Sequence, residues 1–138
     1  MGSGFEYSLQ HIAEAAEWLL AQCADRRIIL FSGDMGTGKT TLSKALVTKL
    51  GGVSKLSSPT FAIVNEYAGI QGTLYHVDLY RLKTTDEAID AGMEDYLLSG
   101  NWCFVEWPEI ILPLLRPNEF IHVKITSINQ ETRKIDLI

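Results

Sequence analysis

IILFSGDMGTGKTT, residues 28–41, is the stretch that decides the fold of this chain. Residues 33–40 of it fit the pattern of a phosphate-binding loop, which is Gly, four residues, Gly, Lys and then Ser or Thr. The apolar run 28–31 before the loop is typical of a buried parallel strand. Residues 41–50 predict a helix, because their apolar side chains recur along one face. Strand, loop and helix in this order predict a nucleotide-binding site.

The residue types of the loop suit the binding of a chain of phosphates. Its glycines let the backbone curl around an anion and expose N–H groups, and the start of the helix adds its positive dipole. Lys39 is placed to reach the outer phosphates, and the Thr40 hydroxyl to ligate magnesium. Each charge-assisted hydrogen bond is worth about 1.5–3 kcal/mol, so several together hold a nucleoside triphosphate. The predicted nucleotide-binding residues of the loop are Gly33, Asp34, Met35, Gly36, Thr37, Gly38, Lys39, Thr40 and Thr41.

Length and composition predict one globular domain over residues 1–138, with residues 1–4 as a remnant of cloning. The chain has 138 residues, of which 46% are hydrophobic and 21% charged, as in ordinary water-soluble domains. The loop motif and the order of strands and helices along the chain predict an α/β domain with a P-loop NTPase fold. It has three layers, with a mixed parallel and antiparallel central sheet. The net charge of −5 argues against independent nucleic-acid binding, but not against a local anion site.

Sequence features also predict the compartment. No apolar run is long enough to span a membrane, and no signal peptide is visible. The two cysteines, Cys23 and Cys103, have neither a disulfide-framework spacing nor a metal-ligand spacing. We expect both to be buried, reduced thiols in a cytoplasmic protein.

Several further elements follow from local patterns. The sequence predicts a strand at 5–7, a helix from 9 to about 24 capped by Ser8, and a strand at 102–105. Residues 61–80 and 120–138 predict two hairpins, so some strands are antiparallel at one side of the sheet. The Thr84 and Glu87 pair has capping-box spacing, which starts a helix near 85 that is interrupted around Gly92 and ends at Leu98. Residues 110–115 form an irregular or short helical connector between prolines.

A phosphate-binding loop needs an acidic partner for the metal, and two residues are candidates. Glu106 ends the apolar run 102–105, and Asp78 lies within strand-like sequence, where aspartate is unusual. Either could instead be a surface carboxylate, so this choice stays open from spacing alone. Ser58, Pro59 and Thr60 form either a nucleotide-sensing loop or a simple turn, and their local sequence favours the turn.

The roles of two residues near these acids, Trp107 and His76, also stay open from the sequence. Trp107 is a core residue, or an aromatic surface that a base or a partner covers. His76, taken alone, is interpreted as a packed strand residue, and His11 and His122 carry no functional signal.

Together these segments resemble the bacterial TsaE (YjeE) family of small ATPases. The matching pieces are residues 33–41, S-P-T-F at 58–61, H-V-D-L-Y-R at 76–81 and V-E-W-P-E at 105–109. Their order and spacing match from about Tyr7 to the C-terminus. The loop alone is shared by many families, whereas the combination is far more specific.

The resemblance implies a role in making N6-threonylcarbamoyladenosine at position 37 of tRNAs that read codons starting with adenine. The resemblance further implies that the family's ATPase docks on the TsaD–TsaB heterodimer. Its link to tRNA is then indirect, through this complex. Its ATP hydrolysis is thought to reset that complex between turnovers.

The resemblance also implies roles for single residues. Thr40 and Glu106 would ligate Mg²⁺, Lys39 would bind the phosphates of ATP, and Asp78 would orient or activate water, which makes Lys39, Asp78 and Glu106 the catalytic set. Other implied residues are the switch at Ser58, Pro59 and Thr60, Trp107 at the nucleotide site or partner surface, and Ser8 and Arg133 as ATP contacts.

Two other function classes compete with this reading. A nucleotide-dependent binding module with negligible hydrolysis would carry the same loop. A small-molecule kinase would need a lid with several arginines, whereas this chain has five arginines, two of which (Arg26 and Arg27) precede the first core strand. A GTPase would carry an N-K-x-D motif, which is absent from the sequence.

Overall fold

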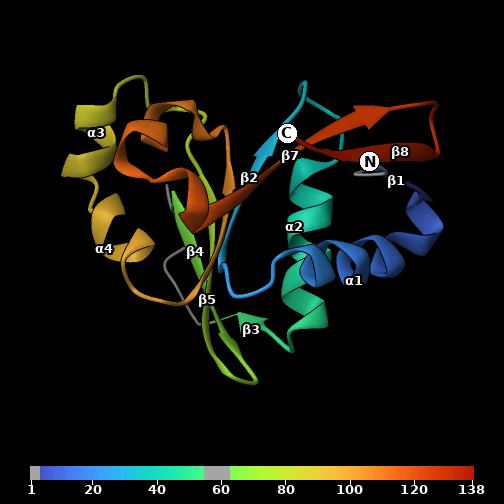
Figure 1. Ribbon diagram of the computed structural model, residues 1–138, viewed down its shortest axis with the longest axis horizontal. Helices are drawn as coiled ribbons and strands as arrows, with labels where there is room; N and C mark the ends of the chain where they lie inside the picture. Colours follow the sequence, from blue (N-terminus) through green and yellow to red (C-terminus); the bar gives the residue numbers. More distant parts are fainter. Residues whose placement is uncertain (1–3, 55–62) are drawn as a thin grey trace.

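A computed structural model describes residues 4–54 and 63–138, and it has the three layers that the sequence predicts (Figure 1). One mixed sheet of eight strands forms the middle layer, in the order β1-β8-β7-β2-β6-β5-β4-β3. The strand bounds are β1 Gly4–Ser8, β2 Ile28–Ser32, β3 Val53–Ser54, β4 Val64–Gly69, β5 Gly72–Asp78, β6 Trp102–Glu106, β7 Phe120–Ser127 and β8 Thr132–Leu137.

The centre of the sheet is parallel and both of its sides are antiparallel. Strand β2 pairs in parallel with β6 and with β7, and β6 pairs in parallel with β5. Strand β2 is buried along nearly its whole length, as expected of a strand covered on both faces. Antiparallel pairs flank this centre, β4 and β3 beyond β5, and β8 and β1 beyond β7. The expectation of antiparallel strands at one side therefore extends to both.

Helices cover the two faces of the sheet in separate groups. Helices α1 (Ile12–Gln22) and α2 (Lys39–Lys49) pack on one face, and their core includes Leu19, Leu46 and Ile29. The other face carries α3 (Thr85–Asp90), α4 (Met93–Leu97) and the 3₁₀ helix η2 (Pro108–Leu114) (Figure 1). The cores on the two faces enclose β2 and place the loop after it at the end of the central strands.

Most local predictions are confirmed. Thr84 and Glu87 form a complete capping box at the start of α3, and Gly92 separates α3 from α4. Both hairpins are present, and residues 110–114 of the predicted connector lie in η2. Cys23 and Cys103 are buried free thiols.

Two predictions at the N-terminus are wrong. The first turn after Ser8 is a 3₁₀ helix, η1 (Leu9–His11), and α1 begins only at Ile12. Ser8 makes no cap, because its hydroxyl bonds Nδ1 of His11 and the Leu9 amide donates to the carbonyl of Glu131 at 2.8 Å. Gly4, expected outside the fold, is the first residue of β1. Within the described ranges, no helix has the length and apolar character needed to cross a bilayer.

Candidate nucleotide site

The loop between β2 and α2 has a backbone that only glycine adopts without strain. Gly33 has φ 148° and Gly36 has φ 84°. A Cβ on Gly33 would lie 2.7 Å from the carbonyl oxygen of Ile125 in β7, so the loop passes too close to that strand for a side chain. A Cβ on Gly36 would meet nothing within 4 Å, so this position is open to a ligand. The two glycines thus serve different purposes, namely close packing and an open approach.

Hydrogen bonds hold the loop in place from within and from the last hairpin. The Thr37 hydroxyl donates to the Asp34 carbonyl at 2.8 Å, which closes the turn. Arg133 in β8 donates from Nε to the Thr37 carbonyl at 3.0 Å and from Nη1 to the Asn129 carbonyl at 2.7 Å. In this structure the Arg133 guanidinium therefore supports the loop from outside.

Lys39 folds back over the loop that it follows. Its ammonium donates to the carbonyl oxygens of Gly33 at 2.5 Å and of Asp34 at 3.3 Å. The same ammonium lies 3.8 Å from the centroid of the Trp107 ring, a cation–π contact. Burial lowers the pKa of Lys39, and the nearby carboxylates of Glu106, Asp34, Asp78 and Glu109 oppose that shift. A buried ammonium whose direct hydrogen-bond partners are neutral carbonyls has the charge that an anion site requires.

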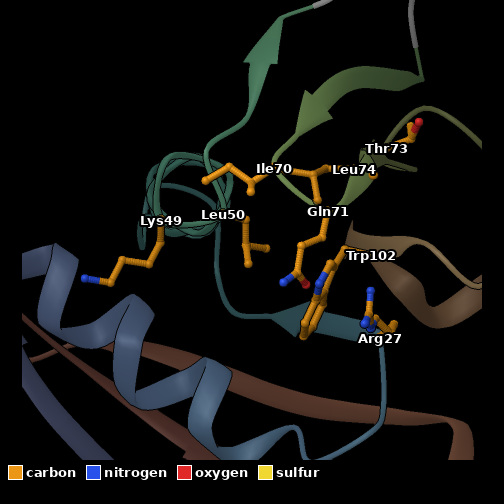
Figure 2. Close-up of a pocket in the computed structure, with 9 residues that line it drawn as sticks. Arg27, Lys49, Leu50, Ile70, Gln71, Thr73, Leu74 and Trp102 are labelled. Carbon is orange, nitrogen blue, oxygen red and sulfur yellow. The ribbon is translucent and has the colours of Figure 1, made fainter.

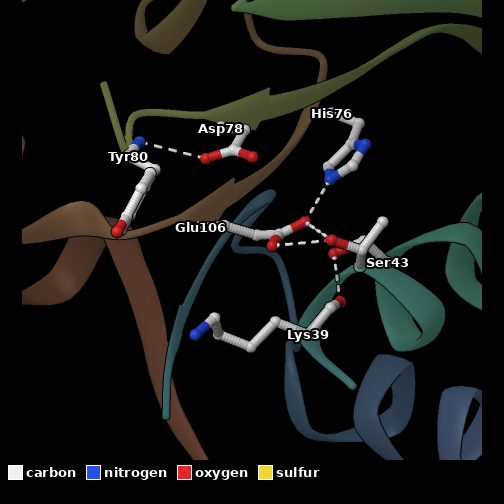
Figure 3. A network of polar contacts seen from close by, with 7 residues as sticks. Lys39, Ser43, His76, Asp78, Tyr80 and Glu106 are labelled. Carbon is white, nitrogen blue, oxygen red and sulfur yellow. Dashed lines mark hydrogen bonds and ion pairs between the residues drawn. The ribbon is translucent and has the colours of Figure 1, made fainter. Parts of the chain in front are cut away.

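Glu106 and Asp78 lie side by side at the ends of neighbouring strands. Their Cα atoms are register partners of the parallel pair β5 and β6. The Thr40 hydroxyl donates to both carboxylate oxygens of Glu106, at 2.9 and 2.8 Å. Glu106 is buried, whereas Asp78 is exposed and accepts the Tyr80 amide at 3.0 Å (Figure 3). The two acids therefore have distinct settings: Glu106 contacts the loop residue, and Asp78 faces solvent.

His76 is a site residue that the sequence did not identify. Its Nε2 atom lies 2.5 Å from Oε2 of Glu106, and both side chains are almost fully buried (Figure 3). Its Nδ1 atom is buried without a hydrogen-bond partner among the described residues. His76 and Asp78 share one face of β5 because strand side chains alternate, and that spacing is the signal that could have found it.

Trp107 occupies a strained position at the edge of the site. Its backbone has φ 57° and ψ 59°, in the left-handed region that a bulky residue rarely adopts, at a cost of about 1–3 kcal/mol. This turn lets the ring contact Lys39 on one side and Tyr80, whose ring centroid is 5.1 Å away, on the other. Tyr80 is a second residue that was missed, although it lies in the H-V-D-L-Y-R segment close to Asp78.

These groups line one cleft of about 320 Å³. Nine of the predicted site residues line it together with Tyr80: Met35, Gly36, Gly38, Lys39, Thr40, Thr41, Asp78, Glu106 and Trp107. Gly33, Asp34 and Thr37 form the turn of the loop beneath it, as their hydrogen bonds show. Ser8 and Arg133 do not line the cleft, although their strands β1 and β8 pair. Ser58, Pro59 and Thr60 lie outside the described residues.

The same chemistry suits a magnesium ion that is shared with phosphates. A hydroxyl and a carboxylate, the ligands that Mg²⁺ takes in such sites, are already in contact at Thr40 and Glu106. Residues 4–54 and 63–138 contain no cluster of three or more His, Cys, Asp or Glu side chains that would hold a metal alone. The residues present therefore fit an ion that arrives with a nucleotide.

Comparison with known proteins assigns the family. The sequence-family model described as "Threonylcarbamoyl adenosine biosynthesis protein TsaE" matches residues 7–135 of this chain. The TsaE protein of Rickettsia conorii is 33% identical over 132 residues, which cover 95% of this chain and 74% of that protein. That of Haemophilus influenzae is 36% identical over 124 residues, covering 89% and 77%.

A solved structure agrees with the sequence relatives. The crystal structure of YdiB from Bacillus subtilis superposes with a TM-score of 0.70 at 26% identity, covering 99% of this chain and 86% of that one. The loop, the neighbouring acids and these matches agree, and the chain belongs to the TsaE family of tRNA threonylcarbamoyladenosine biosynthesis proteins.

Proposed function

We propose that this chain is a magnesium-dependent ATP hydrolase whose turnover supports the TsaD–TsaB transferase complex, which makes N6-threonylcarbamoyladenosine at position 37 of tRNA. Membership of the TsaE family supports the pathway. The observation that carries the enzymatic part is the contact between the Thr40 hydroxyl and the Glu106 carboxylate at the mouth of the loop. A loop that only bound phosphate would not need a buried acid held against its threonine.

Each residue of the cleft has a part in this proposal. The loop amides and Lys39 bind the phosphates of ATP, and they stabilise the charge that develops as the terminal phosphoryl group leaves. Thr40 and Glu106 would hold Mg²⁺, which neutralises phosphate charge when bound. His76 fixes the orientation of the Glu106 carboxylate through the contact of its Nε2 with Oε2. Asp78, which is exposed in the cleft, orients or activates the attacking water.

The cleft has little cationic charge, which supports slow hydrolysis by the chain alone. Lys39 is the single cation among the described residues that line it, and Arg133 is bonded to the Thr37 carbonyl. Phosphate-loop enzymes without an arginine at the transferred phosphoryl group are slow, and a partner that supplies one accelerates them by roughly 10³–10⁵. TsaD and TsaB are the proposed partners, and tRNA is reached through them rather than by this acidic chain, whose net charge is −5.

The low cationic charge of the cleft is also consistent with a second candidate function, that of a nucleotide-dependent binding module with negligible hydrolysis. The two functions differ in one measurement, the release of phosphate from Mg–ATP with and without purified TsaD–TsaB. We expect weak release by the chain alone and a large increase with the pair. If TsaD–TsaB does not increase phosphate release, the result supports the nucleotide-dependent binding module instead. A kinase is disfavoured, because no arginine lines the cleft within the described part of the chain.

Two substitutions, each with a matched control, test the site. Lys39→Ala should abolish ATP binding, whereas Lys44→Ala, on the exposed face of the same helix, should not. Glu106→Gln should preserve ATP binding measured in EDTA but lose the gain in affinity and turnover that Mg²⁺ gives, whereas Glu94→Gln in α4 should behave as wild type. Unchanged phosphate release in both Lys39→Ala and Glu106→Gln would show that hydrolysis takes place elsewhere.

A further inference from the structure

A second cavity, of about 220 Å³ (Figure 2), lies where β5 and β6 begin, whereas the nucleotide cleft lies where these strands end. The residue before β2, the end of α2 and the turn between β4 and β5 complete its walls. Trp102 opens β6 and Glu106 ends it. A strand rises about 3.3 Å per residue, so the two sites are roughly 13 Å apart along that strand. The cavity is therefore separate from the ATP chemistry.

The floor of this cavity is apolar and its lip is an exposed isoleucine. Leu50, Leu74 and Trp102 form the inner wall, and Leu74 is almost completely buried. Ile70 forms the lip and is 82% exposed, although it is a large apolar residue. Val53 in the neighbouring strand β3, which pairs with β4, is also 69% exposed, although it does not line the cavity. An exposed large apolar side chain at the lip of an apolar cavity is typical of a protein interaction site.

One cation beside the cavity, Arg27, has no acidic partner in the part of the chain that the structure describes. The Arg27 guanidinium lies 5.3 Å from the centroid of the Trp102 ring, and no ion pair of Arg27 is present among the described residues. Lys49, by contrast, pairs with Glu17 of α1 at 3.0 Å, and its side chain points away from Trp102 in Figure 2. The positive charge available to an incoming group is therefore that of Arg27, with Gln71 and Thr73 as additional polar groups in the wall.

The walls are joined to each other before any occupant arrives. The Ile70 amide donates to the Leu50 carbonyl at 3.2 Å, which ties the β4–β5 turn to the end of α2. Gly51 makes this approach possible, since a Cβ there would lie 2.4 Å from Cγ1 of Ile70. A cavity that is already formed lowers the entropy cost of binding.

We propose that this cavity docks a segment of a partner polypeptide that inserts one large apolar side chain and places a carboxylate, a few residues away, on Arg27. The volume is below the ~300–1,000 Å³ that is usual for small-molecule sites, and it suits a single side chain. Arginine binds carboxylates through two parallel hydrogen bonds, so its charge selects an acidic neighbour. The proposal does not depend on nucleotide, because no residue of the cavity lines the nucleotide cleft.

Selection of random peptides displayed on phage against the intact protein tests this proposal. We expect enriched peptides to combine a large apolar residue with Asp or Glu within a few positions. The selected peptide, made synthetically, should bind Ile70→Asp and Arg27→Glu roughly tenfold or more weakly. It should bind Lys49→Gln within about twofold of wild type, because Lys49 is paired and directed away. Selection against Arg27→Glu should in turn enrich Lys or Arg.

Two comparisons make the result decisive. Thermal unfolding of each variant shows that the fold is retained, which we expect because Arg27, Ile70 and Lys49 are all exposed. Lys39→Ala should bind the peptide as wild type does, so failure of the ATPase proposal would leave this one unaffected. The proposal is overturned if no peptide is enriched, if the enriched peptides carry no acidic residue, or if they bind Ile70→Asp as tightly as wild type.

Discussion

Replacing Gly33 with alanine should destabilise the whole domain, because this glycine lies where the nucleotide loop passes β7. With φ at 148°, the residue has a backbone that costs an L-amino acid about 2 kcal/mol. The new Cβ would also lie 2.7 Å from the Ile125 carbonyl and 2.9 Å from the Thr37 hydroxyl. The first atom belongs to the backbone of β7, so relief requires a shift of the loop or the strand, which costs about 2 kcal/mol more.

We therefore expect Gly33→Ala to lower the free energy of unfolding by about 4 kcal/mol, which is roughly 12 °C in Tm for a domain of this size. Gly36→Ala is the matched control. Its φ is 84° and a Cβ would meet nothing within 4 Å, so only the backbone cost of about 1–2 kcal/mol applies. Urea unfolding followed by far-ultraviolet circular dichroism measures both variants. Equal destabilisation by the two changes would refute the close approach of the loop to β7.

Three further outcomes follow from features described above. Thr84→Ala should lower the free energy of unfolding by about 1 kcal/mol in urea, because the hydroxyl caps α3 by accepting the Glu87 amide at 3.1 Å. Burial raises the pKa of Cys23 and of Cys103 from 9.0 to about 12, so neither thiol should react with Ellman's reagent at pH 8 until urea unfolds the protein. The unfolded chain ionises first, so this contribution to stability is complete below pH 9 and falls by about 1.4 kcal/mol per thiol per pH unit above it, as pH-dependent urea titrations would show. His76→Phe should weaken the Mg²⁺ dependence of ATP hydrolysis roughly 10–100-fold while leaving ATP binding in EDTA intact. His76→Asn, which keeps a hydrogen-bonding group, should restore part of the Mg²⁺ dependence. Equal hydrolysis by the two variants would exclude a hydrogen-bonding role for His76.

Local signals allowed much of this fold to be predicted from the sequence. The strand–loop–helix unit, the capping box at Thr84 and the two hairpins each depend on residues close together in the chain. Prediction failed where a distant segment decides the local structure. Ser8 is a good helix cap in isolation, but the Leu9 amide is held by the Glu131 carbonyl from the last hairpin, so the first turn is a 3₁₀ turn.

The choice between the two acids also depended on tertiary structure. Asp78 and Glu106 belong to strands that pair in parallel, and only this pairing brings both carboxylates to the same level of the sheet. The order of strands then places β6 next to β2, so that Glu106 reaches the threonine of the loop. His76 was overlooked for the same reason, because its partner is Glu106 on the next strand. Spacing along the chain predicts which residues are candidates, and strand pairing determines their different environments.

The position of Lys39 has a consequence for selectivity among anions under the proposed function. Its ammonium has two carbonyl oxygens and the face of an indole as neighbours, so the protein itself partly compensates the charge of this lysine. An anion that binds Lys39 has to replace these contacts of the ammonium with the carbonyl oxygens and the indole ring. A single inorganic phosphate offers few contacts in exchange, whereas a triphosphate also engages the loop amides and Thr40. Under the proposed function, we therefore expect the folded-back lysine to favour long phosphate chains over the simple anions that surround the protein.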